Sequence, residues 1–314
     1  MGIQDITCSD LTIPTGGTLT ANSSTITCSG DFTTSGGLLG ASCLKFEGTD
    51  DVVTIPISAS ENDHIKGAFA DGIFTVEGWV KMESGFTEGI WVHKQGEFSI
   101  HIARTNATTW ALADGASFNF SANAFTMPNL EDGKWHHLAF ARYGGASGGV
   151  QQYYNIYVDG KLELTHTIGG TNAFPSADDD DLYIGSYNDG VNPASNWLNN
   201  IHVENVRIWG TTRTAAQIRA DMFNSTPTTS ATDCIANFTF NEGTSTVITA
   251  SDPNTMSSNE TAGTWNGAWA GAGTYTVGTS TLVMSGSSKK INYLKDETFN
   301  KLTVSGTVSL FGVD

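Results

Sequence analysis

The chain has 314 residues, of which 39% are hydrophobic and 15% are charged, with 35 glycines and 7 prolines. This composition excludes a disordered chain and a collagen-like chain, and the many glycines favour short strands joined by turns. Its 15 basic and 32 acidic residues give a net charge of −17, which disfavours binding to nucleic-acid phosphates or anionic lipid. Apolar runs all fall short of the roughly 18 residues that a spanning helix needs, so we expect no membrane insertion.

The N-terminal segment, residues 1–39, contains a repeat with a period of 20 residues. Residues 6–9, Ile-Thr-Cys-Ser, recur as residues 26–29, and the Gly-Gly pair at 16–17 recurs at 36–37. Short β-branched stretches between glycine-rich corners are typical of a β-solenoid, in which each coil buries its apolar side chains against the next coil. The alternative is a pair of ordinary hairpins of similar composition.

The C-terminal segment, residues 272–314, repeats at the same spacing, since Leu282–Gly286 is echoed by Leu302–Gly306. Two coils at each end are fewer than a free-standing solenoid usually needs. We therefore expect the flanks to stack on each other, on another subunit or on a continuation of the polypeptide. The repeating pattern of apolar residues continues at residues 310–314. We therefore expect the chain to be one piece of a stalk and to form a homo-oligomer.

Residues 40–271 predict an antiparallel β-sandwich, so the fold class is all-β. Residues 73–81 alternate, with Phe74, Val76 and Val80 on one face and Thr75, Glu77 and Trp79 on the other, which is the period of a strand. Further strands are predicted at residues 98–102, 137–142, 154–158 and 182–184. We expect Trp79, Trp135 and Trp209 to be core residues because they lie in strand patterns.

Two local signals are specific. Asp159-Gly160 between two strand patterns predicts a type I′ hairpin, whose central residues both need a positive φ. Thr214 and Gln217 form a capping-box pattern, which predicts a short helix that ends near Met222.

Several segments in order resemble the laminin-G-like, concanavalin-A-type jelly-roll family over residues 40–271. The segments that carry the resemblance are Leu44–Pro56, Phe74–Lys81, Gly133–Ala139, Tyr157–Gly160, Leu182–Gly185, Val206–Trp209 with the helix that follows, and Ala236–Gly243. The order of these segments is specific for the fold. It is weak for function, because the family includes adhesins, lectins, enzyme accessory modules and virion proteins.

The resemblance also implies a calcium site at the sandwich edge, with Asp50, Asp51, Glu204 and Asn205 as ligands. Calcium takes six to eight oxygen ligands, so carboxylates and amides from distant loops are the required chemistry. The family's usual Asp-Glu is replaced here by Glu204-Asn205. This pair keeps oxygen donors, but the difference weakens the assignment of the family's calcium ligands to these positions. The alternative for Asp50 and Asp51 is an Asx-type turn.

A loop at residues 186–197 is the candidate ligand site. It combines amides and carboxylates, which pair with sugar hydroxyls, with aromatic rings that can stack on a sugar face. The candidate ligand-binding residues are Tyr187, Asn188, Asp189, Asn192, Asn196 and Trp197. The alternative is a long loop whose Trp197 packs back into the sandwich.

The sequence gives little support to catalysis, and we expect no enzyme. Residues 61–66 approach the paired-carboxylate strand motif of sandwich glycosidases but end in Lys66 instead of Glu. His136 and His137 are neighbours on a strand and point to opposite sides, so packing beside Trp135 is favoured over metal binding. The acidic run at residues 178–181 is interpreted as solvated, with a cation role as the alternative.

The four cysteines, Cys8, Cys28, Cys43 and Cys234, lack metal-ligand spacing and are interpreted as buried small hydrophobic residues.

The function predicted from these features is that of a virion structural protein, a bacteriophage fibre or capsid decoration, whose lectin-like head binds a surface glycan. Its partners would be other virion proteins or copies of itself, joined through the repeat flanks. The first ten residues lack the features of a signal peptide, and virions reach the outside by lysis. The alternatives are a bacterial cell-surface adhesin located outside the cell and a polysaccharide hydrolase.

Overall fold

In a computed structural model, the chain forms two compact units. One unit is formed by residues 1–43 and 269–314, and the other by residues 44–268. We call the first the repeat unit and the second the head. The described residues are 6–13, 18–20, 25–29, 32–34, 39, 42–48, 51–57, 65, 73–94, 98–106, 109–111, 124–126, 130–143, 152–168, 181–186, 197–225, 227, 233–243, 245–250, 260–265, 267–271, 274–276, 281–292 and 301–311.

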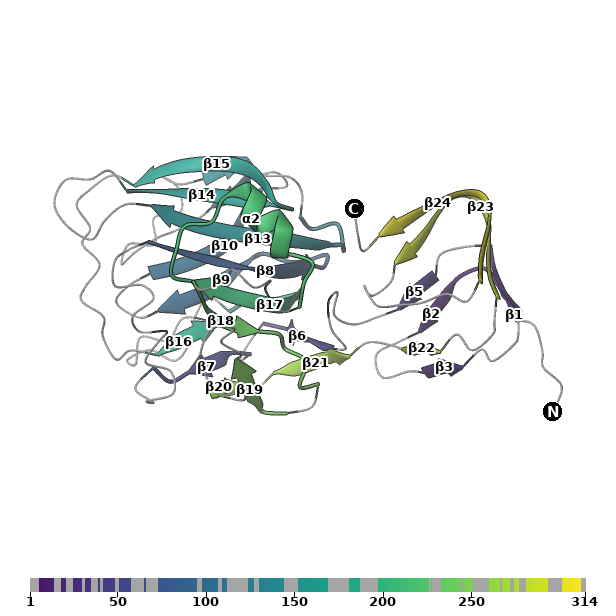
Figure 1. The fold of residues 1–314 in the computed structure, drawn as a ribbon, viewed down its shortest axis with the longest axis horizontal. Coiled ribbons are helices and arrows are strands. Elements are labelled where there is room, and N and C mark those ends of the chain that lie inside the picture. The colour runs from purple at the N-terminus through teal and green to yellow at the C-terminus, as the bar shows by residue number, and fades with distance from the viewer. Residues whose placement is uncertain are drawn as a thin grey trace. The chain divides into compact units, whose positions relative to one another are not determined.

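The strands of the repeat unit pair in parallel (Figure 1). Its strands are β1 (Ile6–Cys8), β2 (Leu11–Ile13), β3 (Thr18–Thr20), β4 (Thr25–Cys28), β5 (Phe32–Thr34), β22 (Thr274–Thr276), β23 (Thr281–Asn292) and β24 (Lys301–Phe311). The order in the described sheet is β1-β4-β23-β5-β2, with β24 also paired to β23, and β22 pairs with β3 in a second small sheet. Ile6 lies opposite Ile26, and Leu282 lies opposite Leu302. These pairings therefore follow the 20-residue period of the sequence.

The two ends of the chain meet in this unit, which is the first of the three arrangements expected for the flanks. Thr25 of β4 pairs with Thr281 of β23, and Thr18 of β3 pairs with Thr274 of β22. In each of these two pairs the partners are 256 residues apart in the sequence, since 281 − 25 = 256 and 274 − 18 = 256. The head therefore lies in the sequence between strands of the repeat unit that pair with one another.

The head is a sandwich of two antiparallel sheets, as the sequence predicted. We call the first the helix-side sheet; its order is β15-β14-β13-β8-β17-β6-β21, with β18 paired to β17. Its strands are β6 (Ser42–Phe46), β8 (Phe74–Met82), β13 (Trp135–Tyr143), β14 (Gln152–Val158), β15 (Lys161–Ile168), β17 (Ile201–Trp209), β18 (Cys234–Phe238) and β21 (Ala268–Gly271). The chain crosses between the two units within β6 and β21.

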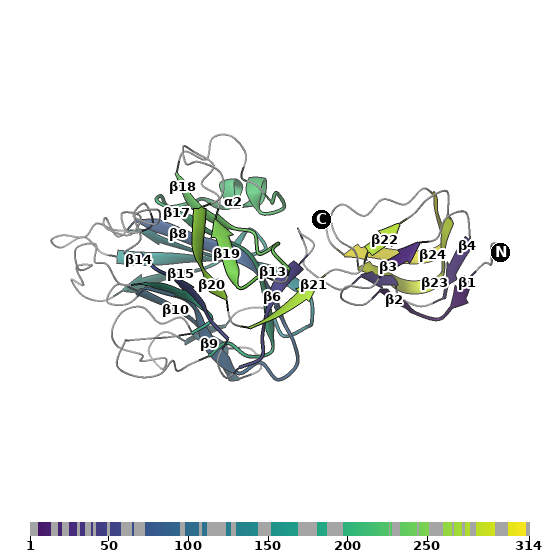
Figure 2. The same ribbon diagram turned by 90° about the horizontal axis from the view of Figure 1, so that it is seen from below.

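The second sheet, which we call the opposite sheet, has the order β12-β11-β10-β9-β16-β7-β20-β19. Its strands are β7 (Val53–Ile55), β9 (Glu88–Lys94), β10 (Phe98–Asn106), β11 (Thr109–Ala111), β12 (Ala124–Thr126), β16 (Leu182–Ile184), β19 (Val247–Ala250) and β20 (Glu260–Trp265). The helix α2 (Ala215–Asp221) lies on the outer face of the helix-side sheet, away from β9 and β10 (Figure 2).

The core lies between the sheets and is closed by aromatic rings. Trp91 of β9 is fully buried and meets Phe140 of β13 edge to face, with ring centroids 5.7 Å apart. Gly78 of β8 makes room for this ring, because a Cβ atom there would lie 3.1 Å from Cζ2 of Trp91. A glycine in mid-strand therefore permits the two sheets to pack closely at this point.

The local signals predicted from the sequence are confirmed. Asp159 and Gly160 have φ values of 50° and 71° between β14 and β15. Thr214 is the N-cap of α2, and the reciprocal bonds of a capping box are present between Thr214 and Gln217. The C-cap is Met222. Among the described helical residues, no segment has the length and hydropathy required to cross a bilayer.

Candidate functional site

The predicted ligand loop begins and ends at one point of the sandwich. Five of its six candidate residues, Tyr187, Asn188, Asp189, Asn192 and Asn196, lie outside the described residues. Trp197 is described and is half-buried. The residue is therefore neither fully buried in the sandwich nor fully exposed.

The two ends of the loop are tied together directly before and after it. The backbone N–H of Leu198 donates to the carbonyl oxygen of Gly185 at 2.8 Å. Leu198 is fully buried, and it lies so close to β9 that a Cβ atom on Gly89 would come within 2.6 Å of the Leu198 Cα atom. Gly185 has a φ of +97°, a value that favours glycine. The chain therefore leaves and re-enters the sandwich at one rigid position.

Two asparagines after Trp197 bind the neighbouring turn. The Nδ2 atom of Asn199 donates to Oγ1 of Thr87 at 2.8 Å, and the Thr87 N–H donates to Oδ1 of Asn199 at 3.1 Å. Asn200 donates from Nδ2 to the carbonyl oxygen of Gly85 at 3.1 Å and accepts at its own carbonyl from the N–H of Glu83 at 2.8 Å. These four bonds fix the backbone that follows Trp197 to the turn after β8.

The structure describes three of the four predicted calcium ligands, Asp51, Glu204 and Asn205. Asp50 lies outside the described residues. The Oδ2 atom of Asp51 accepts from the N–H of Glu47 at 2.5 Å, a bond that spans four residues and closes the chain after β6. An Asx-type turn instead bonds the backbone two residues further on, so the turn interpretation of Asp51 stays a prediction. The described part of the chain holds no group of three or more His, Cys, Asp or Glu side chains placed to hold a metal ion.

Glu204 and Asn205 are buried in β17, which is an interior strand of the helix-side sheet. The pairing of β17 with β8 shifts between Glu204 and Arg207, and Asn205 has a φ of 52°. This is a β-bulge, and asparagine tolerates its left-handed backbone. The Nδ2 atom of Asn205 donates to the carbonyl oxygen of Ser225, at 3.2 Å. Asn205 therefore anchors the segment after α2, and the calcium site remains a prediction.

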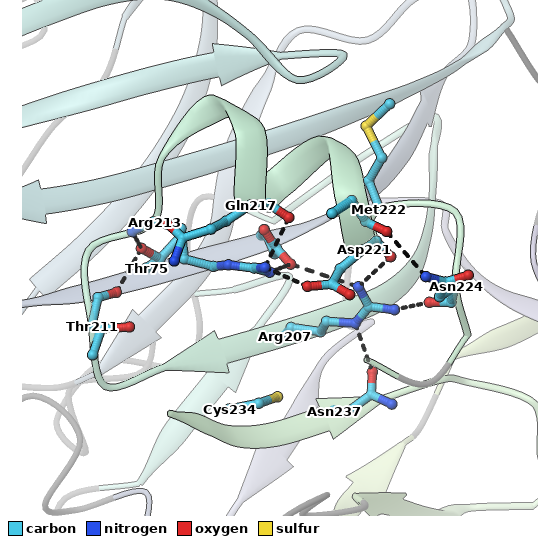
Figure 3. A network of polar contacts seen from close by, with 12 residues as sticks. Thr75, Arg207, Thr211, Arg213, Gln217, Asp221, Met222, Asn224, Cys234 and Asn237 are labelled. Atoms are coloured by element: carbon cyan, nitrogen blue, oxygen red, sulfur yellow. Dashed lines mark hydrogen bonds and ion pairs between the residues drawn. The ribbon is translucent and has the colours of Figure 1, made fainter. Parts of the chain in front are cut away.

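A buried polar network joins the helix-side sheet to α2 and to the residues that follow the helix (Figure 3). Arg207 of β17 donates from Nη1 to the carbonyl oxygen of Asp221, at 2.9 Å, and from Nε to Oδ1 of Asn237, at 3.1 Å. It also donates to the carbonyl oxygen of Asn224. Trp79 donates from Nε1 to the carbonyl oxygen of Met222, at 2.7 Å. The carbonyls at the C-terminus of α2 are therefore satisfied by side chains of the sheet.

Arg213 connects two buried carboxylates in this network. Its Nη1 atom lies 3.0 Å from Oε1 of Glu77, and its Nη2 atom lies 2.5 Å from Oδ2 of Asp221. The guanidinium carbon lies 3.6 Å from the ring centroid of Trp209. Glu77 is completely buried, and Arg213 and Asp221 are at least nine-tenths buried. Because Glu77 lies in β8 and Asp221 is the last residue of α2, the contacts of Arg213 assign this group to holding the helix on the sheet.

A second polar cluster lies at the turn after β14 and was missed in the sequence. His136 bonds from Nδ1 to Oδ2 of Asp159 at 2.9 Å and from Nε2 to Oδ1 of Asp132 at 3.1 Å. Burial opposes protonation of this ring, but the bonds and charges of Asp159 and Asp132 outweigh it and raise the pKa of His136. The signal available in the sequence was the pair of Asp132, shortly before β13, and Asp159, directly after β14.

The neighbouring His137 packs differently from the prediction. Its ring meets Trp79 edge to face at 5.2 Å, whereas Trp135 meets His202 at 6.4 Å. Burial, with the nearby charges of Arg207 and Arg213, holds the pKa of His137 well below its ordinary value. Trp79 and Trp209 are buried as expected, but beneath α2; Trp135 is only half-buried.

Comparison with protein families finds one matching family model. The model of the concanavalin A-like lectin/glucanases superfamily matches residues 47–219, which is more than half of the chain. These residues contain the strands β7 to β17 and the first part of α2. No curated protein sequence matches the chain.

Solved structures resemble the chain at low sequence identity. A candidate carbohydrate binding protein from Bacteroides ovatus is 17% identical over 76% of this chain and 62% of its own, with a TM-score of 0.49. A SAP-like pentraxin from Limulus polyphemus is 16% identical over 58% of this chain and 81% of its own, with a TM-score of 0.41. Domains LG4-5 of the mouse laminin alpha1 chain are 13% identical over 57% and 44%, with a TM-score of 0.37. The chain thus spans less than two thirds of the Bacteroides protein.

Proposed function

Because the chain belongs to the concanavalin A-like lectin/glucanases superfamily, we propose that its head is a non-catalytic module that binds a surface glycan. The binding site would be the loop at residues 186–197. The repeat unit would carry the head and attach it to other copies or other proteins.

The observation that supports the proposal most strongly is the position of Trp197. Trp197 is half-buried, and the three residues after it are fixed to Gly185, Thr87 and Gly85 by hydrogen bonds. An aromatic side chain on a fixed backbone has less conformational entropy to lose when a sugar stacks on it. The amide and carboxylate residues of the same loop would supply the hydrogen bonds that select the sugar.

The charge of the chain indicates which glycans to expect. A net charge of −17 creates a negative potential that disfavours sulfated, sialylated or phosphorylated sugars. We therefore propose a neutral glycan as the ligand.

A glycan array with the full chain tests this function. We expect retention of at least one class of neutral glycan, and loss of that retention in the Trp197→Ala variant. Incubation with the retained polysaccharide should release no reducing ends. Retention of no glycan would contradict the binding function, and release of reducing ends would show that the head is an enzyme.

Calcium is not needed for this proposal. Of the expected ligands, the amide of Asn205 is bonded to Ser225 and the carboxylate of Asp51 is bonded to Glu47. A calcium site would need further oxygens from outside the described residues. Thermal unfolding with calcium and with chelator tests it, since an ion that binds only the folded state must raise the melting temperature.

We further propose that the protein is a virion component, a bacteriophage fibre or capsid decoration. A glycan-binding head inserted into a repeating ladder would suit a molecule that holds a host receptor at a distance from a particle. Mass spectrometry of purified particles from lysed cells tests this: the chain should copurify with the particles. Its recovery only from cell envelopes would favour the adhesin alternative.

A further inference from the structure

Two of the four cysteines lie side by side in the repeat unit. Cys8 of β1 and Cys28 of β4 are direct partners in a parallel pair of strands, and their Sγ atoms are 3.4 Å apart. The backbone N–H of Ser29 donates to the carbonyl oxygen of Cys8 at 3.0 Å, so the pairing continues past the two thiols. Cys28 is fully buried and Cys8 is half-buried. Both are reduced in this structure.

The backbone spacing at this position suits a covalent bond. Neighbouring strands lie about 4.8 Å apart, and disulfides join Cα atoms that are roughly 4.4 to 6.8 Å apart. The two sulfur atoms need to approach from 3.4 Å to a bond length of about 2.05 Å, which side-chain rotation can supply. The other two cysteines lie elsewhere: Cys43 donates to the carbonyl oxygen of Ala270 and Cys234 to that of Ala236.

We propose that Cys8 and Cys28 form an oxidisable pair that closes a disulfide between the first two turns of the repeat unit. The oxidant is a small disulfide such as glutathione disulfide. This inference does not depend on the glycan-binding function, and it assigns to the two thiols a role that the sequence alone did not suggest.

The reaction takes place in two exchange steps. The thiolate of Cys8, the more exposed of the two, attacks one sulfur of glutathione disulfide; the oxidant's S–S bond breaks and one glutathione leaves as its thiolate. The thiolate of Cys28 then attacks the Cys8 sulfur of this mixed disulfide and displaces the second glutathione. The protein loses two protons and two electrons, and one glutathione disulfide is reduced to two molecules of glutathione.

The second step should be the slower one at neutral pH. Burial, followed by the hydrogen bond and charge of Cys8 and the charge of Asp10, raises the pKa of Cys28 to about 12. Because the thiolate is the attacking species, closure of the disulfide should accelerate as the pH rises.

The consequence is a covalent tie at the edge of the parallel sheet. In the described structure, β1 is held by β4 alone, through three paired residues. Pairs this short open readily. A disulfide would close a loop from residue 8 to residue 28 and would prevent β1 from separating, which is useful to a protein that leaves a reducing compartment for an oxidising one.

Thiol counting and peptide mapping on the native full chain test the pair. After incubation at pH 8 with a mixture of reduced and oxidised glutathione, we expect two of the four thiols to disappear and a peptide linked through Cys8 and Cys28. Cys43 and Cys234 should be alkylated after unfolding, which makes them the internal controls. The Cys28→Ser variant should stop at a glutathione adduct on Cys8, and the Cys8→Ser variant should keep its remaining thiols.

Three results would overturn the inference. The first is four free thiols in a buffer that fully oxidises a model dithiol. The second is a disulfide that joins Cys43 or Cys234 to either partner. The third is a link that forms only in denaturant, because that link would not depend on the folded pairing. The denaturation midpoint of the repeat unit should also be higher in the oxidised chain than in the reduced chain, with no such difference in Cys8→Ser.

Discussion

Replacement of Arg213 by methionine should destabilise the head strongly, because it removes a charge that pairs with two buried carboxylates; Arg207, 3.6 Å from Glu77, would remain beside one of them. Arg213 contacts Glu77 at 3.0 Å, Asp221 at 2.5 Å and the carbonyl oxygen of Gln217 at 2.9 Å. Methionine keeps much of the side-chain volume over the ring of Trp209 but makes none of these bonds. Breaking a buried ion pair by removal of one partner costs about 3 to 5 kcal/mol, so we expect a loss of about 4 kcal/mol.

Unfolding in guanidinium chloride, followed by tryptophan fluorescence, measures this loss. With a denaturant dependence of about 4 kcal/mol per molar, the midpoint should fall by roughly 1 M. Arg219→Met is the matched control, since Arg219 lies in α2, is exposed and donates from Nη1 to the carbonyl oxygen of Gly160 at 2.7 Å. The control should lose less than about 1 kcal/mol.

A double-mutant cycle separates the ion pair from other effects of the substitution. If Glu77 and Arg213 are coupled, the variant with both Glu77→Gln and Arg213→Met should lose less stability than the sum of the two single variants, by about 0.5 to 3 kcal/mol. Equal losses in Arg213→Met and Arg219→Met, together with additive single losses, would refute the assignment of this network to anchoring α2.

Two further predictions concern acid and the joining of the chain ends. Burial is the leading cause that lowers the pKa of His101 and of His202 to about 4, against an ordinary value of 6.5. As the pH falls, the unfolded chain therefore binds protons at these histidines before the folded chain does. The free energy of unfolding should be highest above pH 6.5 and should decrease towards pH 4, by about 3 kcal/mol for each histidine. Equal denaturation midpoints at pH 7.5 and 4.5 would contradict this. Met284 of β23 lies opposite Cys28 on the side away from Cys8, so Met284→Cys in a Cys8→Ser chain should be linked to Cys28 in glutathione buffer. Absence of that linked peptide would argue against the pairing of segments 256 residues apart.

The sequence predicts the elements that depend on near neighbours. The alternation in β8 was visible because Phe74, Val76 and Val80 recur at every second residue, and the hairpin at Asp159-Gly160 depends on two adjacent residues. The cap of α2 involves Thr214 and Gln217, which are one turn apart. Each of these signals lies within a few residues, so the chain specifies them locally.

The features that the sequence did not predict depend on contacts between distant residues. The bulge at Asn205 inserts one residue, which changes the face that its side chain occupies, and no periodic pattern marks it. The contact of Arg213 with Glu77 joins residues 136 positions apart. The pairing of β4 with β23 was one of three arrangements consistent with the 20-residue period, because a repeat fits equally well on any neighbouring turn.

The most direct test of glycan binding by the head is a titration of the best array glycan into three proteins: the full chain, Trp197→Ala and Tyr153→Ala. Tyr153 is a suitable control because it is also a half-buried aromatic residue, and it stacks on Tyr143. Tyr143 follows Arg142, which pairs with Phe74 at the first end of β8. Trp197 instead lies four residues before Ile201, which pairs with Met82 at the other end of β8. Loss of a central aromatic contact costs about 2 kcal/mol or more, so the account predicts a Kd at least about 30 times higher for Trp197→Ala and an unchanged Kd for Tyr153→Ala. An unchanged Kd for Trp197→Ala would contradict it.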